Sequence, residues 1–216
     1  DYRMRKLFVL MGFVCLGLFI LGCGASATKD PMGFVDRIVK GDIFVKSQGG
    51  ADFTKITVRT PLFEVDIVKT GDQAEATVLF TTGALTRLLG NTEFEMKQRR
   101  VTQTGPLMTT RLQKGINISF VPKDATEAKK LVIETDTAIA SIKGTIFKLE
   151  VKDSETILTV SEGTVAFKSI KDNSSVDVEA FFQIKATAAG LGAAVKVNVL
   201  EDPDLAGAGE PIKGAK

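Results

Sequence analysis

Histidine and tryptophan are both absent from this sequence of 216 residues. Without histidine the chain lacks a Ser-His-Asp triad, an imidazole general base and histidine metal ligands. Two cysteines, Cys15 and Cys23, and one tyrosine, Tyr2, are the complete set of their kinds, and all three lie near the amino terminus. These absences remove the commonest nucleophile and metal chemistries. We therefore expect no enzyme, no cofactor and no metal centre.

Carboxylates are the remaining source of catalytic groups, since no nucleophile-elbow, phosphate-loop, dinucleotide or calcium-loop motif is present. Paired carboxylates for glycoside hydrolysis stay open as an alternative, although the tryptophan and tyrosine faces that sugar sites commonly use are missing. The acidic residues considered for this role are Asp66, Asp72, Glu93 and Glu95. A second acidic cluster is interpreted as part of a solvated tail and comprises Glu201, Asp202 and Asp204.

The first 22 residues have the layout of a secretory signal peptide. Arg5 and Lys6 precede an uncharged apolar run over residues 7–21, and Gly22 follows it. A basic start, a short apolar run and a small residue before the cleavage point are typical of such signals. The run is shorter than the roughly 20 residues that a membrane-spanning helix needs. The sequence thus predicts a signal-peptide helix over residues 1–22 that is removed on export.

The segment Ile20-Leu21-Gly22-Cys23 resembles a bacterial lipobox. The resemblance implies that Cys23 is fatty-acylated and becomes the first mature residue, with residues 23–40 as its tether. Acyl chains contribute about 0.8 kcal/mol per buried methylene, enough for several chains to hold a protein on a membrane. Gly24 follows the cysteine where an aspartate would favour the inner membrane, so we expect a lipid-anchored envelope protein, preferentially at the outer membrane.

The charge balance argues against nucleic-acid binding. The formal net charge is +2, and removal of the leader takes away Arg3, Arg5, Lys6 and Asp1, which leaves the mature chain close to neutral. Phosphate neutralisation drives sequence-independent nucleic-acid binding, so a neutral chain is a poor candidate. The densest basic segment, Lys97 to Arg100, is interpreted as a solvated turn.

Short runs of β-branched and aliphatic residues, separated by glycine-containing turns, recur along the rest of the chain. Alternation over residues 146–151 is typical of a half-buried strand. Regular short strands with turn residues between them predict an all-β domain, a sandwich or a solenoid. We expect this β-domain over residues 41–186, a final strand region over 187–200 and a disordered tail over 201–216. Predicted strands include residues 43–46, 56–59, 109–112, 116–121 and 195–199.

Particular residues within this pattern resemble the signature of the FecR domain family. One part is Gly144-Thr145-x-Phe147, followed after a strand by Glu162-Gly163-x-Val165. A second part lies upstream, where Thr70-Gly71 and Asn91-Thr92 resemble the family's V-x-T-G and N-T elements. We expect these motif residues to shape the fold rather than to touch a ligand.

The resemblance implies a domain that takes a signal from another envelope protein. We therefore expect a lipid-anchored protein that binds an envelope component, a protein first of all, in a scaffolding or signalling role. A peptidoglycan- or glycan-binding module is a second hypothesis. The third is a regulator in FecR-type cell-surface signalling. Because few residues precede the apolar run at 7–21, no anti-sigma segment is expected before it, and such regulation would be indirect.

Overall fold

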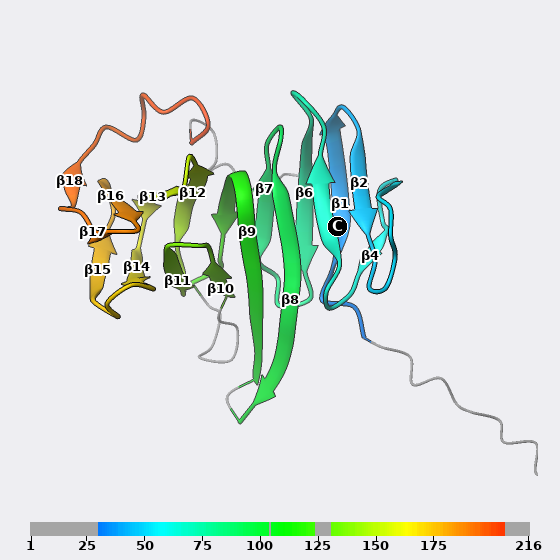
Figure 1. Cartoon of the computed structure of the whole chain (residues 1–216), viewed down its shortest axis with the longest axis horizontal. Helices are drawn as coiled ribbons and strands as arrows, with labels where there is room; N and C mark the ends of the chain where they lie inside the picture. Colours follow the sequence, from blue (N-terminus) through cyan, green and yellow to red (C-terminus); the bar gives the residue numbers. More distant parts are fainter. Residues whose placement is uncertain (1–29, 104, 124–130, 206–216) are drawn as a thin grey trace, which may run out of the picture.

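A computed structural model describes residues 30–103, 105–123 and 131–205, and every regular element in this part of the chain is a β-strand. The predicted all-β fold class is confirmed (Figure 1). Within the described ranges no helix is long and apolar enough to cross a membrane. The predicted signal-peptide helix and the lipobox residues 20–23 lie outside the described residues.

The 18 strands form one open sheet that folds over into two layers. Layer A contains β1 (Gly33–Lys40), β4 (Pro61–Leu62), β6 (Glu75–Phe80), β7 (Leu85–Leu88), β12 (Ile146–Lys152), β13 (Glu155–Glu162), β16 (Phe182–Thr187), β17 (Gly190–Leu191) and β18 (Val195–Lys196). Layer B contains β2 (Ile43–Lys46), β3 (Thr54–Lys55), β5 (Ile67–Thr70), β8 (Glu93–Thr102), β10 (Leu131–Glu134), β11 (Ala138–Ile142), β14 (Thr164–Ser169) and β15 (Ser175–Glu179). The long strand β9 (Gly105–Phe120) belongs to both layers.

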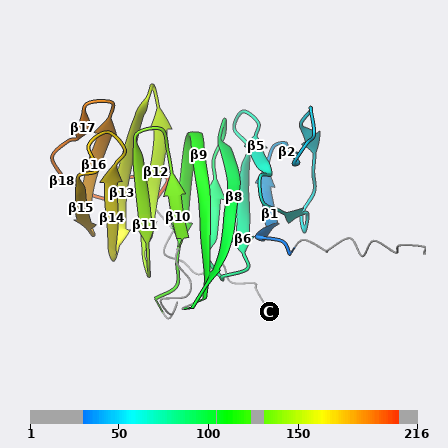
Figure 2. The same ribbon diagram turned by 60° about the horizontal axis from the view of Figure 1, so that its bottom comes forward.

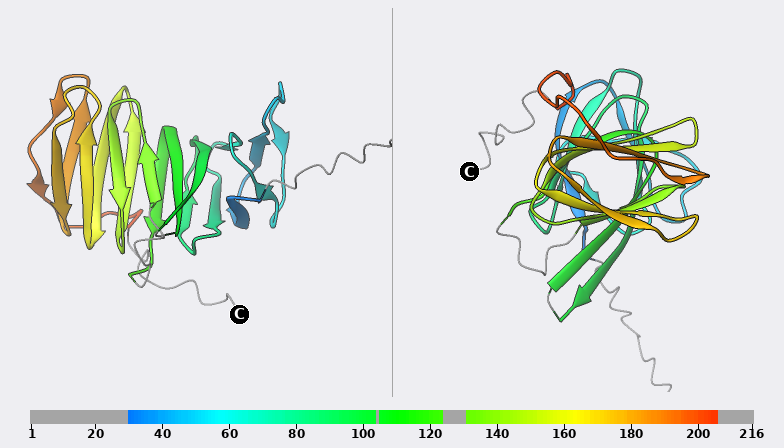
Figure 3. Two further views of the ribbon diagram at one scale, coloured as in Figure 1. Left: turned by 90° about the horizontal axis from the view of Figure 1, so that it is seen from below. Right: turned by 90° about the vertical axis from the view of Figure 1, so that its left-hand side faces the viewer.

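The chain fills the two layers alternately, often one hairpin at a time. The hairpin β10–β11 lies in layer B, β12–β13 in layer A and β14–β15 in layer B again. The pairings are antiparallel except for the parallel pair β9–β10. Figure 2 and the left view of Figure 3 show the strands side by side along the long axis, and the right view shows the two layers facing each other. The fold thus combines a sandwich of two layers with the winding path of a solenoid.

Gly115 is the point at which β9 passes from one layer to the other. Lys114 pairs with Glu93 of layer B, whereas Gly115 pairs with Val151 of layer A. The φ angle of Gly115 is +91°, and a Cβ atom there would stand 2.4 Å from the Thr92 hydroxyl oxygen. Only glycine adopts this conformation and leaves room for that contact. The crossing strand therefore joins the two layers without a loop.

The core lies between the layers and is made by the inward side of each alternating strand. Its largest fully buried side chains include Phe80, Phe94, Phe147 and Phe167. The Phe80 ring of layer A meets the Phe94 ring of layer B edge-on, with ring centroids 6.5 Å apart. Such contacts between the layers hold the sheet in its folded-over form.

The segment from Lys97 to Arg100 is part of strand β8, which corrects its interpretation as a turn. This end of the β8–β9 hairpin projects from the body (Figure 3, right). Lys97 pairs with Glu134, and Arg99 pairs with Asp30 at 3.1 Å. Local carboxylates thus neutralise two of its basic side chains.

Two predicted boundaries differ from the structure. The tether assigned to residues 23–40 includes β1, which pairs with β4 and β6 because its apolar side chains at Val35 and Ile38 pack into the core. At the other end, residues 201–205 of the predicted disordered tail form turns, and Leu205 is buried against layer A. Residues 187–200 do contain short strands, β17 and β18.

Candidate functional site

The two halves of the downstream motif meet at one end of layer A. Gly144 and Thr145 lie directly before β12, and Glu162 and Gly163 lie at the end of β13 and in the turn after it. A Cβ atom on Gly163 would stand 2.7 Å from the Gly144 carbonyl oxygen. Phe147 is fully buried in the core. These residues bring two turns into direct contact, a role in shaping the fold.

The upstream motif residues form a comparable contact between two other turns. The Thr70 hydroxyl donates to the Leu89 carbonyl and accepts a hydrogen bond of 2.8 Å from the Thr92 backbone N–H. The Asn91 backbone N–H donates to the Gly71 carbonyl at 3.1 Å. Thr70 and Thr92 are both buried. The four residues therefore fasten the start of β8 to the end of β5.

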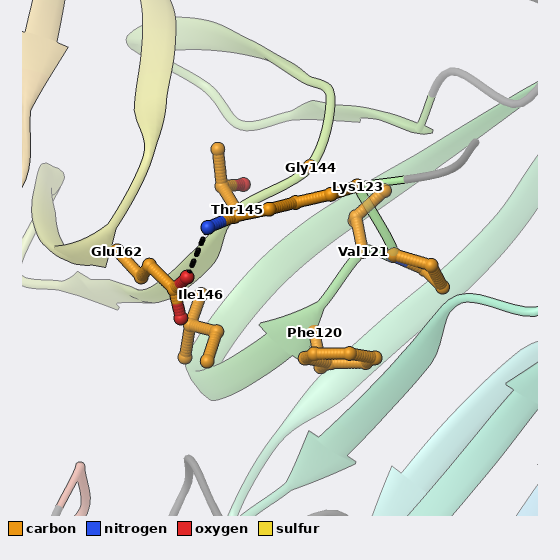
Figure 4. A pocket seen from close by; sticks show the side chains of 8 residues that line it. Phe120, Val121, Lys123, Gly144, Thr145, Ile146 and Glu162 are labelled. Atoms are coloured by element: carbon orange, nitrogen blue, oxygen red, sulfur yellow. Dashed lines mark ion pairs between the residues drawn. The ribbon is translucent and has the colours of Figure 1, made fainter. Parts of the chain in front are cut away.

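A hollow of about 370 Å³ opens beside the downstream motif (Figure 4). Its apolar walls are Phe120, Val121, Pro122 and Ile146. Lys123 and Glu162 reach toward each other at its edge and form an ion pair of 2.5 Å, with 72% and 48% of their side chains exposed. An exposed ion pair of this kind contributes little to stability. The hollow can accept an apolar group, and both charges at its edge are accessible to a partner.

Thr145 is also part of the lining of the hollow, and its hydroxyl has no hydrogen-bond partner within the described residues. The residue is only 1% exposed. A buried hydroxyl normally has a partner, because leaving it without one costs free energy. The Thr145 hydroxyl is therefore a buried polar group without a partner beside an apolar hollow.

An apolar row on the outer face of layer A leads into the hollow. The strand register aligns Phe34 with Leu79, Leu79 with Leu85, Leu85 with Phe120, and Phe120 with Ile146. These five residues are the apolar row. Phe34 is 37% exposed and Phe120 is 40% exposed. Phe120 belongs both to the row and to the hollow, which makes it the centre of the exposed apolar surface at this site.

A segment at the carboxyl end covers the neighbouring part of the same face. Residues 197–205, called the strap, place Val199 and Leu205 against Ile118 of β9. The amino group of Lys148 on β12 pairs with Asp202 and, at 3.4 Å, with Asp204. Two of the three residues assigned to a solvated acidic cluster thus bind a lysine side chain that is only 11% exposed. Glu201 instead accepts a hydrogen bond from Asn198 within the strap.

The pKa of Asp202 reflects this contact. Burial by itself would raise the pKa, but hydrogen bonds from the Lys148 amino group and the Asp204 backbone N–H, together with the lysine charge, outweigh it. The pKa of Asp202 therefore lies below its ordinary value. The carboxylate stays ionised and the pair with Lys148 persists at neutral pH.

The four carboxylates considered for glycoside hydrolysis each have a local partner. Asp66 accepts a hydrogen bond from the Phe63 backbone N–H, Asp72 from Asn91, and Glu95 from Gln113. Burial would raise the pKa of Glu93, but Lys114 and Lys69, at 3.1 and 3.2 Å, lower it overall. A general acid needs the opposite shift.

Metal ligands are not gathered at any point in the described ranges. No group of three or more histidine, cysteine, aspartate or glutamate side chains there is arranged to hold a metal ion. The pair Asp202 and Asp204 faces a lysine rather than an open cation position.

Two crystal structures place the fold in a known class. They are structures of a protein from Parabacteroides distasonis described as a "putative anti-sigma factor", with TM-scores of 0.53 and 0.52 and sequence identities of 14% and 15%. Each comparison covers 63% of this chain and 62% of the other chain. The likeness shows a shared all-β fold over that part. No curated protein matches the sequence.

A family match comes from the sequence itself. Residues 66–166 match the family model described as FecR protein. The upstream and the downstream motif both lie within this range. In each of them the structure brings two turns into contact. Residues 66–166 are therefore similar to the FecR family, and the resemblance of the motif residues to that family is confirmed.

Proposed function

We propose that this protein is a lipid-anchored component of the bacterial envelope whose FecR domain binds another envelope protein, in a signalling or scaffolding role. Cys23 carries the lipid in this proposal, and the domain acts by contact rather than by catalysis. A FecR-type signalling role is supported by the family match over residues 66–166 and by the likeness to the protein described as a "putative anti-sigma factor".

The observation that carries the proposal is the hollow beside the motif. It combines apolar walls, the 40% exposed ring of Phe120 and two accessible opposite charges. Protein interfaces commonly consist of a large apolar side chain in a pocket, surrounded by polar and charged groups. A partner that inserts one apolar side chain here could also exchange the Lys123–Glu162 pair for charges of its own.

Photo-crosslinking in the native envelope tests the contact surface. A benzophenone amino acid placed at Phe120 is expected to capture one protein species reproducibly. The same probe at Phe181, which is 48% exposed and lies between β15 and β16, is the matched control because it preserves side-chain type and exposure. Equal capture at both positions would refute the proposed site. Muropeptides captured at Phe120 would instead favour the glycan-binding hypothesis.

The lipid anchor needs a separate experiment. Labelling with an alkyne fatty acid is expected to mark the wild-type chain and to leave Cys23→Ser unmarked. Cys15→Ser is the matched control, because this cysteine lies within the predicted leader and should leave labelling intact. A Cys23→Ser protein that takes up the label to the wild-type extent would contradict acylation at this residue.

A further inference from the structure

The strap differs from the other segments of layer A in how it is held. The Val197 backbone N–H still donates to the Phe181 carbonyl, at 2.8 Å. From residue 198 onward, the backbone hydrogen bonds of the strap are to its own residues, such as Leu205 N–H to the Asp202 carbonyl at 3.1 Å. Its polar contacts with the body are made by the side chains of Lys148 and Arg87. Segments without a shared backbone ladder open at lower free energy than core strands.

The apolar contacts of the strap are also separate from the main core. Val199 and Leu205 belong to a small cluster with Ile118, against which Leu89, Ile116 and Val197 pack. Neither Val199 nor Leu205 is part of the core between the layers. Removing the strap would therefore uncover the outer face of layer A and leave the inner core in place.

The face under the strap has the chemistry of a binding groove. Arg87, Ile118 and Lys148 follow one another across β7, β9 and β12 in register. Arg87 donates to the Asp204 backbone carbonyl, and Lys148 holds two carboxylates that lie one residue either side of Pro203. Ile118 then receives Leu205. These three positions hold the Asp202-x-Asp204-Leu205 part of the strap.

We propose that the strap is a displaceable internal ligand. In its place, the groove of Arg87, Ile118 and Lys148 binds an acidic segment of a partner protein. That segment carries two carboxylates separated by one residue, followed by a large apolar side chain. This inference goes beyond the proposed function and does not depend on the hollow. The groove lies next to the apolar row, since Ile118 and Phe120 are on the same strand and face, as are Lys148 and Ile146. Opening of the strap would widen the exposed face that leads to the hollow.

A peptide competition experiment with the full chain tests the proposal. The probe is a fluorescent peptide with the sequence of residues 197–205, VNVLEDPDL, and binding is followed by fluorescence polarisation. The triple variant Asp202→Asn, Asp204→Asn, Leu205→Ala removes the side chains that hold the strap. An internal segment competes at an effective concentration in the millimolar range. We therefore expect the triple variant to bind the peptide at least about tenfold more tightly than wild type does.

Two controls identify the groove. A peptide with both aspartates replaced by asparagine should bind the triple variant at least about tenfold more weakly, because it loses the charge-assisted hydrogen bonds to Lys148. Adding Lys148→Met to the triple variant should weaken binding of the native peptide to the same degree. Equal binding by wild type and triple variant, or binding that ignores the two aspartates, would overturn the proposal. Loss of the cooperative thermal transition in the triple variant would also overturn it, because the strap would then be part of the core.

Discussion

Gly163 stands so close to Gly144 that a Cβ atom on Gly163 would lie 2.7 Å from the Gly144 carbonyl oxygen. The φ angle of Gly163 is +81°, a conformation in which a side chain adds strain of its own. This contact joins the turn before β12 to the turn after β13, and the two turns carry the motif residues. The family motif therefore records a steric requirement of the fold.

Gly163→Ala is predicted to lower the free energy of unfolding by more than about 2 kcal/mol. The left-handed conformation alone costs an alanine about 1–2 kcal/mol, and the clash with the Gly144 carbonyl adds to it. Gly83→Ala is the matched control: Gly83 has φ +86°, but nothing lies within 4 Å of its Cβ position. Urea denaturation of both variants measures the difference. Equal losses of unfolding free energy in Gly163→Ala and Gly83→Ala would show that the contact with Gly144 relaxes without cost.

Phe147→Ala is predicted to cost about 3–5 kcal/mol, because the ring is fully buried and its removal leaves a cavity. Phe120→Ala, with a ring 40% exposed, should cost far less while it removes the wall of the hollow. Thermal and urea unfolding provide the comparison. A Phe120 variant as unstable as the Phe147 variant would mean that Phe120 supports the fold rather than a binding surface.

The sequence predicted individual strands well where the pattern is local. Strand β2 begins and ends where expected, at 43 and 46. The strands expected at 109–112 and 116–121 are one strand, because Gly115 lets β9 continue from one layer into the other. The strand expected at 56–59 is wrong, since residues 56 and 57 are irregular and residues 58 and 59 form a turn with Arg59 at φ +65°.

Contacts between distant parts of the chain were beyond local patterns. Residues 201–205 of the strap belong to the predicted disordered tail, which is rich in proline, glycine and charge, yet Lys148, 54 positions before Asp202, holds them in place. The motif residues were found by resemblance, but the hollow beside them depends on Phe120 and Lys123, which belong to another strand and its following loop. No periodic pattern in the sequence indicates that Lys148 meets Asp202. None indicates that Phe120 and Lys123 lie beside the motif residues.

Thr145→Val is predicted to leave the free energy of unfolding unchanged or to raise it by up to about 1 kcal/mol. The hydroxyl it removes has no partner within the described residues, so no hydrogen bond is lost. Thr70→Val is the control, because it removes the acceptor of the Thr92 N–H and should cost about 1–3 kcal/mol. A destabilised Thr145 variant would assign the hydroxyl a structural role.

The pair Lys148–Asp202 is predicted to make closure of the strap sensitive to acid. Because the pKa of Asp202 is lowered in the folded protein, the pair stabilises the strap above about pH 4, the ordinary range for aspartate, and this contribution is lost as the pH falls through the lowered pKa. Asp204 shares the lysine, and Arg87, itself 3.6 Å from Glu75, donates to the Asp204 backbone carbonyl. The Asp204 backbone N–H donates to Asp202 at 3.0 Å, so its NMR shift reports the titration directly. The midpoint of the Asp202 titration should lie below that of a free aspartate and should rise toward it in Lys148→Met. The amide signals of β12 show whether the body stays folded. A midpoint at or above the free value in the wild-type protein would contradict the pair.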